Sequence, residues 1–201
     1  MSKYQICVSG AAQGETVEYS HKLAYHLGVQ IAKRGHTLLT GATSGLPQYA
    51  ADGAHDNGGI SIGFSPASSI RAHIHSYRLP FKEFDYINFT GMDYVGRDIH
   101  LVRSADAVIT VGGRMGSLHE FSTAMESHKV VAVLTGSGGL ADFIPTLLER
   151  IESPGKEGII FDVDPERIVD RVIAELDERY RDFKQDIENA PRPGKTSRHA
   201  G

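Results

Sequence analysis

The sequence predicts a single α/β domain with a doubly wound, mostly parallel Rossmann-like sheet and helices on both faces. Strand and helix patterns alternate along the whole chain. The strand patterns are short continuous apolar runs, such as residues 130–134, and these are typical of parallel strands buried on both faces. Because crossovers between parallel strands are right-handed, such an order favours a doubly wound sheet.

The amino-terminal half alternates strands that stop at glycine with helices. Residues 16–34 have the apolar spacing of a helix, with Leu23 and Ile31 on one stripe. Gly35 follows this stripe in the place of a C-cap glycine. Residues 65–80 have no clear pattern. The expected strands are residues 4–9, 37–40, 60–64 and 86–89, and the other expected helices are residues 46–56 and 92–103.

The carboxy-terminal half continues the alternation. Its expected strands are residues 107–111, 130–134 and 159–162, and its expected helices are residues 117–127, 140–151 and 165–183. Neither a linker nor an internal repeat divides the chain, so residues 1–188 are expected to form one domain. Residues 189–201 contain two prolines, a glycine and a lysine close together, which favours a disordered tail.

Composition limits the partners of the chain. Its 201 residues are 40% hydrophobic, enough for the core of one domain, and its net charge is −4. We therefore expect no general attraction to nucleic acid or to an anionic membrane. The single cysteine, Cys7, excludes an internal disulfide and is expected to be buried. We see no signal peptide and no apolar run that could span a bilayer, which favours a cytoplasmic protein.

Three expected strands end in glycine-containing turns, at residues 10–14, 41–45 and 112–116. In a parallel sheet these turns meet at the carboxyl edge, where open α/β folds bind ligands. The backbone N–H groups of such a turn and the dipole of the following helix favour an anion. One turn alone would be explained by the need for a positive φ. Three glycine-containing turns at the carboxyl edge of one sheet favour a ligand site.

Several common sites are disfavoured by the same turns. Gly10 and Gly14 do not form G-x-G-x-x-G, and no acidic residue ends the second strand, so a dinucleotide is not expected. A P-loop pattern is also absent. His73 and His75 would share one face of a strand, but no third ligand follows at a suitable spacing. We therefore expect neither a metal nor a bound cofactor.

A carboxylate follows the third turn by one helical turn. Ser117 is expected to open the helix, and Glu120 lies three residues later on the same side. Ser117 and Glu120 fit a capping box, which is the structural alternative for this pair. A carboxylate beside a phosphate cradle instead suggests that Glu120 contacts another part of a phosphorylated ligand. His119 points a different way around the helix, as a surface or dimer-contact histidine would.

With these motifs assembled, the chain resembles the Lonely Guy (LOG) family, also known as lysine decarboxylase-like proteins. Residues 112–120 are similar to the family signature P-G-G-x-G-T-x-x-E, and residues 92–106 are similar to its M-x-x-R-K segment followed by S-D-A. Residues 41–47, with a later Gly53-Ala54, are similar to its second glycine loop. The wider group includes molybdenum-cofactor carrier proteins and nucleotide-sensing domains.

The resemblance implies hydrolysis of the N-glycosidic bond of a nucleoside 5′-monophosphate, giving a free base and ribose 5-phosphate. Arg97 and Glu120 then occupy the positions of the catalytic pair. Without the resemblance, Arg97 would be read as a surface arginine. The resemblance also implies a homodimer with a small-molecule nucleotide ligand. The residues expected to bind phosphate or nucleotide are Gly10, Gly41, Thr43, Ser44, Gly45, Gly112, Gly113, Arg114, Met115, Gly116 and Ser117.

The chain departs from the family pattern in several places, and the first is Tyr94 at the methionine position of the M-x-x-R-K segment. Val111 replaces the signature proline, and Ser117 replaces threonine while keeping a hydroxyl. Asp98 stands where active members have lysine, which exchanges a cation for an anion near the expected phosphate site. Arg114 inside the glycine turn could compensate for that exchange. The departure keeps an alternative open, namely a carrier or sensor that binds a nucleotide or cofactor without turnover.

Overall fold

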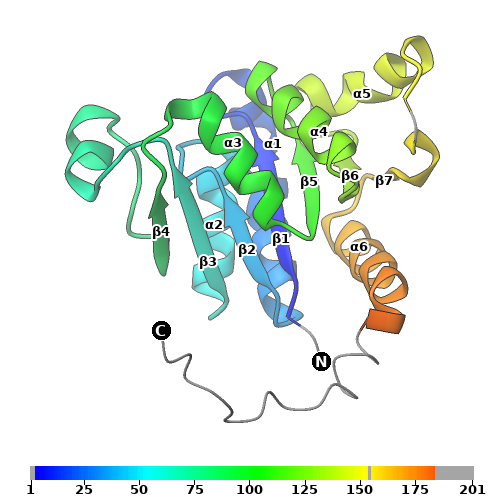
Figure 1. Ribbon diagram of the computed structural model, residues 1–201, viewed down its shortest axis with the longest axis horizontal. Coiled ribbons are helices and arrows are strands. Elements are labelled where there is room, and N and C mark those ends of the chain that lie inside the picture. The colour runs from blue at the N-terminus through cyan, green and yellow to red at the C-terminus, as the bar shows by residue number, and fades with distance from the viewer. Residues whose placement is uncertain (1–2, 154, 184–201) are drawn as a thin grey trace, which may run out of the picture.

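The fold is an all-parallel sheet, as the computed structural model of residues 3–153 and 155–183 shows (Figure 1). Seven strands lie in the order β4-β3-β2-β1-β5-β6-β7, and every neighbouring pair is parallel. The order reverses between β1 and β5, which confirms the doubly wound prediction. The strands are β1 (Gln5–Gly10), β2 (Thr37–Thr40), β3 (Ile60–Ser65), β4 (Tyr86–Phe89), β5 (Ala107–Val111), β6 (Val130–Leu134) and β7 (Ile160–Asp162).

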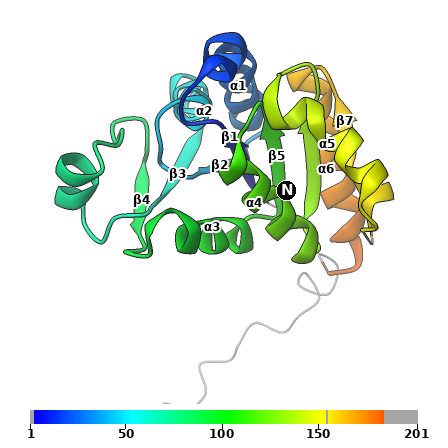
Figure 2. The same cartoon turned by 90° about the horizontal axis from the view of Figure 1, so that it is seen from above.

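Helices cover both faces of the sheet, and each face has its own apolar core (Figure 2). One face is covered by α1 (Glu15–Lys33), α2 (Leu46–Asp56) and α6 (Pro165–Arg179). The other is covered by α3 (Asp93–Ser104), α4 (Met115–Glu126) and α5 (Gly139–Arg150). In β5, Ile109 packs into the first core and Val108 into the second, because side chains alternate across a strand. Cys7 is buried in the second core, as expected.

The start of α4 corrects one expectation. The helix begins at Met115, two residues before Ser117. Gly112 and Gly113 have φ values of 55° and 103°, so the chain turns within two residues of β5. Arg114 is the N-cap in an extended conformation, and its side chain makes no cap hydrogen bond. Ser117 is the third residue of the helix, so the capping-box interpretation with Glu120 is wrong.

The segment between β3 and β4, which had no predicted structure, contains one turn of π-helix at Ala72–Ser76 and protrudes beyond the β4 edge (Figure 1). His73 is buried there. Its Nδ1 lies 2.8 Å from Ser65 Oγ, and its Nε2 lies 2.7 Å from the Pro80 carbonyl oxygen. Both ring nitrogens of His73 therefore have partners, and because the segment is not a strand, His73 and His75 do not share a strand face.

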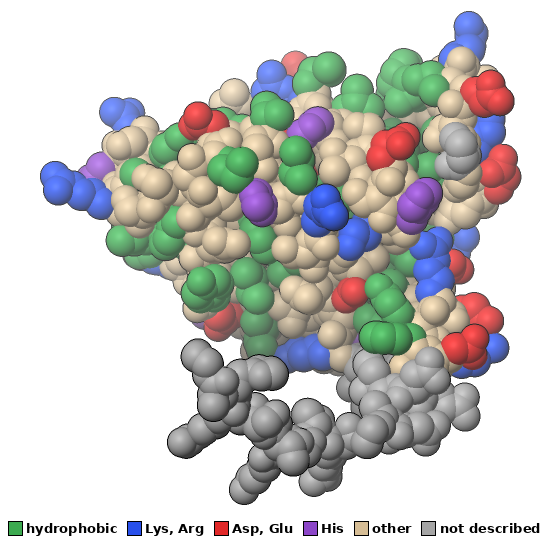
Figure 3. Space-filling view, viewed as in Figure 1, with side chains coloured by type: hydrophobic (Ala, Val, Ile, Leu, Met, Phe, Trp, Pro, Cys, Tyr) green, Lys and Arg blue, Asp and Glu red, His purple; other side chains and the backbone are tan. Residues whose placement is uncertain are grey.

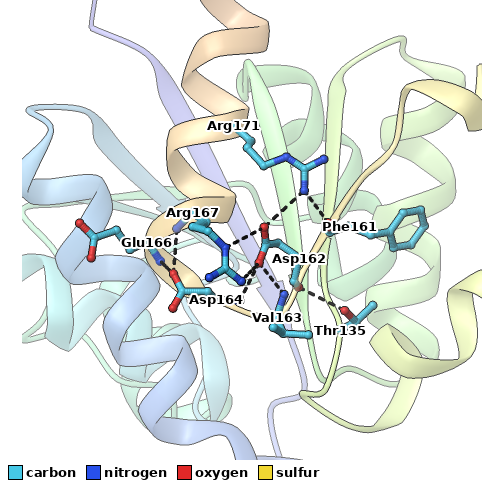
Figure 4. Close-up of polar contacts among 8 residues, drawn as sticks. All are labelled: Thr135, Phe161, Asp162, Val163, Asp164, Glu166, Arg167 and Arg171. Carbon is cyan, nitrogen blue, oxygen red and sulfur yellow. Dashed lines mark hydrogen bonds and ion pairs between the residues drawn. The ribbon is translucent and has the colours of Figure 1, made fainter.

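The junction between β7 and α6 is held by its own side chains (Figure 4). Asp162 Oδ1 accepts hydrogen bonds from the backbone N–H groups of Val163 and Asp164, at 2.8 and 3.0 Å. Arg167 Nη2 donates to the same oxygen at 2.7 Å. The hydrogen bond from Arg167 is the main cause that lowers the pKa of Asp162 to about 2. Asp164 caps α6 by accepting from the N–H groups of Glu166 and Arg167.

Two further expectations concern the ends of the chain. The helix α6 ends at Arg179, and after a turn at Tyr180 residues 181–183 are again helical, so the helix expected at residues 165–183 is divided by one turn. The tail predicted at residues 189–201, and the last five residues of the expected domain, lie outside the described residues. Within the described ranges, none of the helices has both the length and the hydropathy needed to cross a bilayer.

Candidate functional site

A cavity of about 370 Å³ opens at the carboxyl edge of the sheet, where the ends of β1 and β2 meet the start of α4. This is the edge where the strand order reverses and where open α/β sheets bind ligands. The predicted residues that line it are Gly10, Gly41, Thr43, Arg97, Arg114, Met115, Gly116, Ser117 and Glu120. The lining also includes Val8, Ala11, Ala12, Gln13, Pro47, Tyr94 and Asp98, which were not predicted as site residues.

Three helices begin at or next to this lining, and none of them has a side-chain cap. Their N-caps are Gly14 for α1, Gly45 for α2 and Arg114 for α4. In α4, Leu118 is the first residue whose N–H bonds back into the helix, to the Arg114 carbonyl at 3.0 Å. The N–H groups of the preceding turn are therefore available to a ligand. The positive ends of the helix dipoles also favour an anion here.

Ser44 and Gly45 do not line the cavity but fix the loop that does. Ser44 Oγ donates to the Ala12 carbonyl oxygen at 3.2 Å, and Leu46 N–H donates to the Ala11 carbonyl oxygen at 2.9 Å. A Cβ atom on Gly45 would lie 2.4 Å from that Ala11 oxygen. The second glycine loop therefore supports the first by close backbone packing.

Gly112 and Gly113 also lie behind the cavity lining. The Gly112 N–H donates to Ser137 Oγ at 2.8 Å, so it is already used. The carbonyl oxygens of Gly112 and Gly113 accept from Ala141 and Leu140 at 2.8 and 3.1 Å. These contacts tie the turn after β5 to the start of α5. The part of this turn that lines the cavity is therefore Arg114 and the first residues of α4 rather than the glycine pair.

Arg97 is buried, with only 6% of its side chain exposed, so the surface-arginine alternative is wrong. Its Nη1 donates to the carbonyl oxygens of Gly41 and Phe64, the latter at 3.1 Å. Gly41 directly follows β2, and Phe64 is the next-to-last residue of β3, so Arg97 contacts the backbone at the carboxyl ends of two neighbouring strands. A Cβ atom on Gly41 would come within 1.8 Å of Nη1. Only glycine at position 41 leaves room for this guanidinium.

Asp98 links the two helices that frame the cavity. Its Oδ1 forms an ion pair with Arg97 Nε at 3.0 Å, and its Oδ2 lies 3.0 Å from Nδ1 of His119. The Asp98 side chain is 6% exposed, whereas that of His119 is 37% exposed. The sequence interpretation of His119 as a surface residue therefore missed its contact with Asp98. The anion at position 98 is paired rather than free near the expected phosphate.

Glu120 is the buried carboxylate of the site. Ser9 Oγ donates a hydrogen bond to its Oε2. Burial is the largest cause that raises the pKa of Glu120 to about 7, and the charge of Asp98 raises it further. The positive charge of Arg97 and the Ser9 hydrogen bond oppose this rise. Glu120 is therefore a buried carboxylate whose pKa lies near neutral pH.

Two exposed side chains stand at the mouth of the cavity. Arg114 reaches toward the loop after β1, where its Nη1 lies 3.5 Å from the Gln13 carbonyl oxygen. Tyr94 is 46% exposed and makes an edge-to-face contact with Tyr77 at a centroid distance of 5.9 Å. Residues 73–77 do not line the cavity. Arg114 thus places a positive charge at the mouth of the cavity.

The sequence placed Arg97 and Glu120 in one site but missed Ser9, Asp98 and His119 as partners. Asp98 and His119 are the chain neighbours of the two expected catalytic residues. That adjacency was the available signal. Their pairing depends on how α3 packs against α4, which local patterns do not specify.

Comparisons with known proteins agree with this fold. The model of the SLOG cluster4 family matches residues 3–169. An uncharacterized protein of Archaeoglobus fulgidus is 33% identical over 135 residues, covering 67% of this chain and 82% of its own length. The molybdenum cofactor binding protein of Rippkaea orientalis is similar in structure, with a TM-score of 0.69, 26% identity, and coverage of 88% of this chain and 99% of its own.

A second solved structure is equally similar. The molybdenum cofactor carrier protein of Chlamydomonas reinhardtii has a TM-score of 0.68 and 26% identity, over 86% of this chain and 99% of its own. The resemblance of the sequence to the LOG-like group is thereby confirmed.

Proposed function

The chain belongs to the SLOG cluster4 family, and from this premise and the geometry of the cavity we propose that it binds a nucleotide or another phosphorylated small molecule. One observation carries the proposal. The first turn of α4 has no side-chain cap, and its residues Met115, Gly116 and Ser117 line the cavity beneath Arg114. A phosphate there receives backbone N–H donors, a hydroxyl and a guanidinium. The similarity to molybdenum-cofactor carriers supports binding without turnover.

Calorimetry on the purified chain tests this proposal. The ligand panel contains AMP, GMP, CMP, ribose 5-phosphate and unphosphorylated adenosine. We expect at least one phosphorylated compound to bind and adenosine to bind more weakly than AMP. Mass spectrometry of the denatured, freshly purified protein searches for a retained natural ligand, which a carrier would hold intact. Absence of binding by every phosphorylated compound, with no retained phosphorylated ligand, would overturn the proposal.

A second candidate function is hydrolysis of the N-glycosidic bond of a nucleoside 5′-monophosphate. The buried Glu120, whose pKa of about 7 lies near neutral pH, is the observation that favours it. With phosphate at the start of α4, the ribose would lie near Glu120 one helical turn further on. Its carboxylate would stabilise the positive charge that develops on the sugar as the C–N bond breaks, and would orient water. Arg97 would hold the adjacent backbone in place.

Release of free base from each nucleoside monophosphate, followed by liquid chromatography, tests hydrolysis. Glu120→Gln is expected to abolish release while AMP still binds, because the amide keeps the shape but carries no charge. His26→Gln, an exposed change on α1, is the matched control. Binding of AMP without release by the wild-type protein would leave the carrier or sensor function.

We also propose that the chain forms a homodimer through the face beside the cavity. Exposed apolar side chains gather on α3 and at the start of α4, and Figure 3 shows this face of the molecule. They are Met92, Tyr94, Val95, Ile99 and Met115. Light scattering after size-exclusion chromatography is expected to give twice the chain mass. Val95→Asp, at a position that is 67% exposed, should reduce it to a monomer. A monomeric wild-type protein would contradict this proposal.

A further inference from the structure

One aromatic side chain lines the cavity without a part in the proposed phosphate contacts. Among the described residues that line the cavity, Tyr94 is the aromatic one, and it is 46% exposed. It precedes Arg97 by three residues in α3, so both side chains lie on the same face of that helix. Met115, Gly116 and Ser117 line the cavity from the start of α4. The cavity therefore has anion donors on one helix and an aromatic ring on the other.

Tyr77, which follows the π-helical turn, makes two contacts with the start of α3. Its ring meets the ring of Tyr94 edge to face, at a centroid distance of 5.9 Å and an interplanar angle of 71°. Its hydroxyl donates a hydrogen bond to Asp93 Oδ1. In an edge-to-face pair, at least one face of each ring stays uncovered by the other ring. Tyr77 thus supports Tyr94 and leaves it a face for another planar ring.

The backbone just before Tyr94 is held in an unusual conformation. Asp93 has a φ of 53°, in the left-handed region that residues other than glycine rarely adopt. Its N–H donates to the Pro66 carbonyl oxygen at 3.2 Å. The Gly91 N–H donates to the Ala67 carbonyl oxygen at 3.0 Å. Such a conformation persists where surrounding contacts enforce it, and it is found preferentially at ligand sites. The segment between β3 and β4 thus holds the start of α3 through its backbone.

We propose that Tyr94 stacks on a planar aromatic ring of the ligand, and that Tyr77 is a positioning residue for this contact. Stacking of this kind presupposes the proposed function, and it narrows the ligand to compounds that join a phosphate to a planar base, such as nucleotides. The cavity of about 370 Å³ lies within the range of roughly 300–1,000 Å³ that is typical of small-molecule sites. Because every base has a π-face, the contact selects this class rather than one base.

Calorimetry with AMP and ribose 5-phosphate tests the stacking contact, because the second compound has the phosphate and the sugar but lacks the base. The wild-type protein should bind AMP more tightly. Tyr94→Ala removes the aromatic face, so it should weaken AMP binding by about tenfold and leave ribose 5-phosphate binding unchanged. Tyr94→Phe keeps the ring and should bind AMP as the wild type does.

Tyr77→Ala tests the positioning role. This variant keeps Tyr94 but removes the ring contact and the hydrogen bond to Asp93. AMP affinity should fall by about threefold, within the range that an aromatic pair contributes, while ribose 5-phosphate affinity stays unchanged. If Tyr77 served the fold alone, the melting temperature would fall and the ratio of the two affinities would stay as in the wild type, which would overturn this role.

Two controls separate the ring from other effects. Tyr19→Ala is the matched control, because Tyr19 of α1 is 71% exposed and lies outside the cavity lining, and it should change neither affinity. Val95→Asp alters the face proposed for the homodimer beside Tyr94, and it should leave the ratio of the two affinities unchanged. A selective loss of AMP affinity in Val95→Asp would assign the effect to that face and overturn the stacking contact.

Fluorescence of 2-aminopurine riboside 5′-monophosphate gives a direct readout, because stacking quenches this base and the chain contains no tryptophan. Quenching at saturating protein should be smaller in Tyr94→Ala than in the wild type. Unchanged AMP affinity in Tyr94→Ala, equal losses for AMP and ribose 5-phosphate, or equal quenching in both proteins would overturn the stacking contact and leave the proposed function intact. Absence of binding by both AMP and ribose 5-phosphate would instead count against the proposed function, and the stacking contact would fall with it.

Discussion

Two strand-to-helix junctions at the same edge of the sheet are built in opposite ways. At the junction of β7 and α6, Asp164 caps the helix and Asp162 binds the following N–H groups (Figure 4). At the junction of β5 and α4, the helix has no side-chain cap. The carboxylates differ too, since the pKa is lowered to about 2 in Asp162 and raised to about 7 in Glu120.

The difference separates a junction whose helix start is capped by a side chain from one whose helix start is not. At the β7–α6 junction, Asp162 and Asp164 accept hydrogen bonds from the backbone N–H groups at the start of the helix. These contacts stabilise the fold, and those N–H groups are no longer available to a ligand. The β5–α4 junction leaves N–H groups unsatisfied by side chains and buries a carboxylate that burial destabilises. Such a costly arrangement is typical of binding and catalytic sites. Changes at the two junctions should therefore have separate effects on binding and stability.

The largest expected effect follows the loss of the buried cation. Arg97→Met removes the donor to two strand-end carbonyls and leaves Asp98 without its ion pair. Breaking a buried pair in this way should lower the free energy of unfolding by about 3–5 kcal/mol. Urea unfolding followed by circular dichroism measures it. Arg167→Met in the exposed network at α6 is the matched control and should cost much less. Equal losses of unfolding free energy in Arg97→Met and Arg167→Met would contradict the difference described between the two junctions.

The second prediction uses pH. The pKa of Glu120 is raised from 4.5 to about 7 in the fold, so the contribution of this group is fully present below pH 4.5. It is lost as pH rises through 7, by on the order of 3 kcal/mol. Glu120→Gln should remove this loss when unfolding is measured between pH 4.5 and 8.

Asp162 should show the opposite dependence. Its pKa is lowered from 3.8 to about 2, so its contribution is present above pH 3.8 and lost as pH falls through 2. Asp162→Asn should flatten the stability profile at the acid end only. If both variants changed the same end of the profile, the two carboxylates would not differ as described.

The third prediction concerns ligand binding. Arg114 is exposed, and its contact with Gln13 is long at 3.5 Å, so it contributes little to the fold. Arg114→Ala should weaken AMP binding by about tenfold, the loss expected for one charge-assisted hydrogen bond. The melting temperature without ligand should stay unchanged. Arg150→Ala, at the exposed end of α5, is the control and should leave AMP binding as it was.

The smallest expected effect is the loss of the α6 cap. Asp164→Ala removes the acceptor for two backbone N–H groups and should cost about 1 kcal/mol of stability. AMP affinity should not change, because this junction does not contribute to the cavity lining. Calorimetric titration and thermal melting on one sample measure both quantities. A loss of affinity would show that the two junctions are coupled.

The sequence was enough to predict the sheet and most of its helices because these depend on local patterns. Continuous apolar runs such as residues 107–111 specify buried parallel strands, and glycines mark their ends. Arg97 and Glu120 could be placed in one site because each lies within a segment that resembles the LOG family pattern. The π-helical turn at Ala72–Ser76 could not be predicted, since His73 is fixed there by partners outside the turn.

The sequence could not predict which N–H groups of the glycine turns are already bonded within the protein. Gly112 looked like a phosphate donor, yet its N–H binds Ser137 from the loop after β6. The start of α4 at Met115 depends on how that loop packs against the turn. Pairing of Asp98 with His119 requires the contact between α3 and α4. Each of these features arises from tertiary packing rather than from local propensity.

The tight contact between Gly41 and Arg97 has an evolutionary consequence. A side chain at position 41 would occupy the space of the guanidinium, so we expect the two positions to vary together. A lineage that replaces Gly41 first would displace the buried cation, whereas a lineage that loses Arg97 first becomes free to vary at position 41. Among homologues, glycine at this position should therefore accompany arginine at the other. Reversing the order of the two substitutions in the laboratory would reveal this epistasis directly.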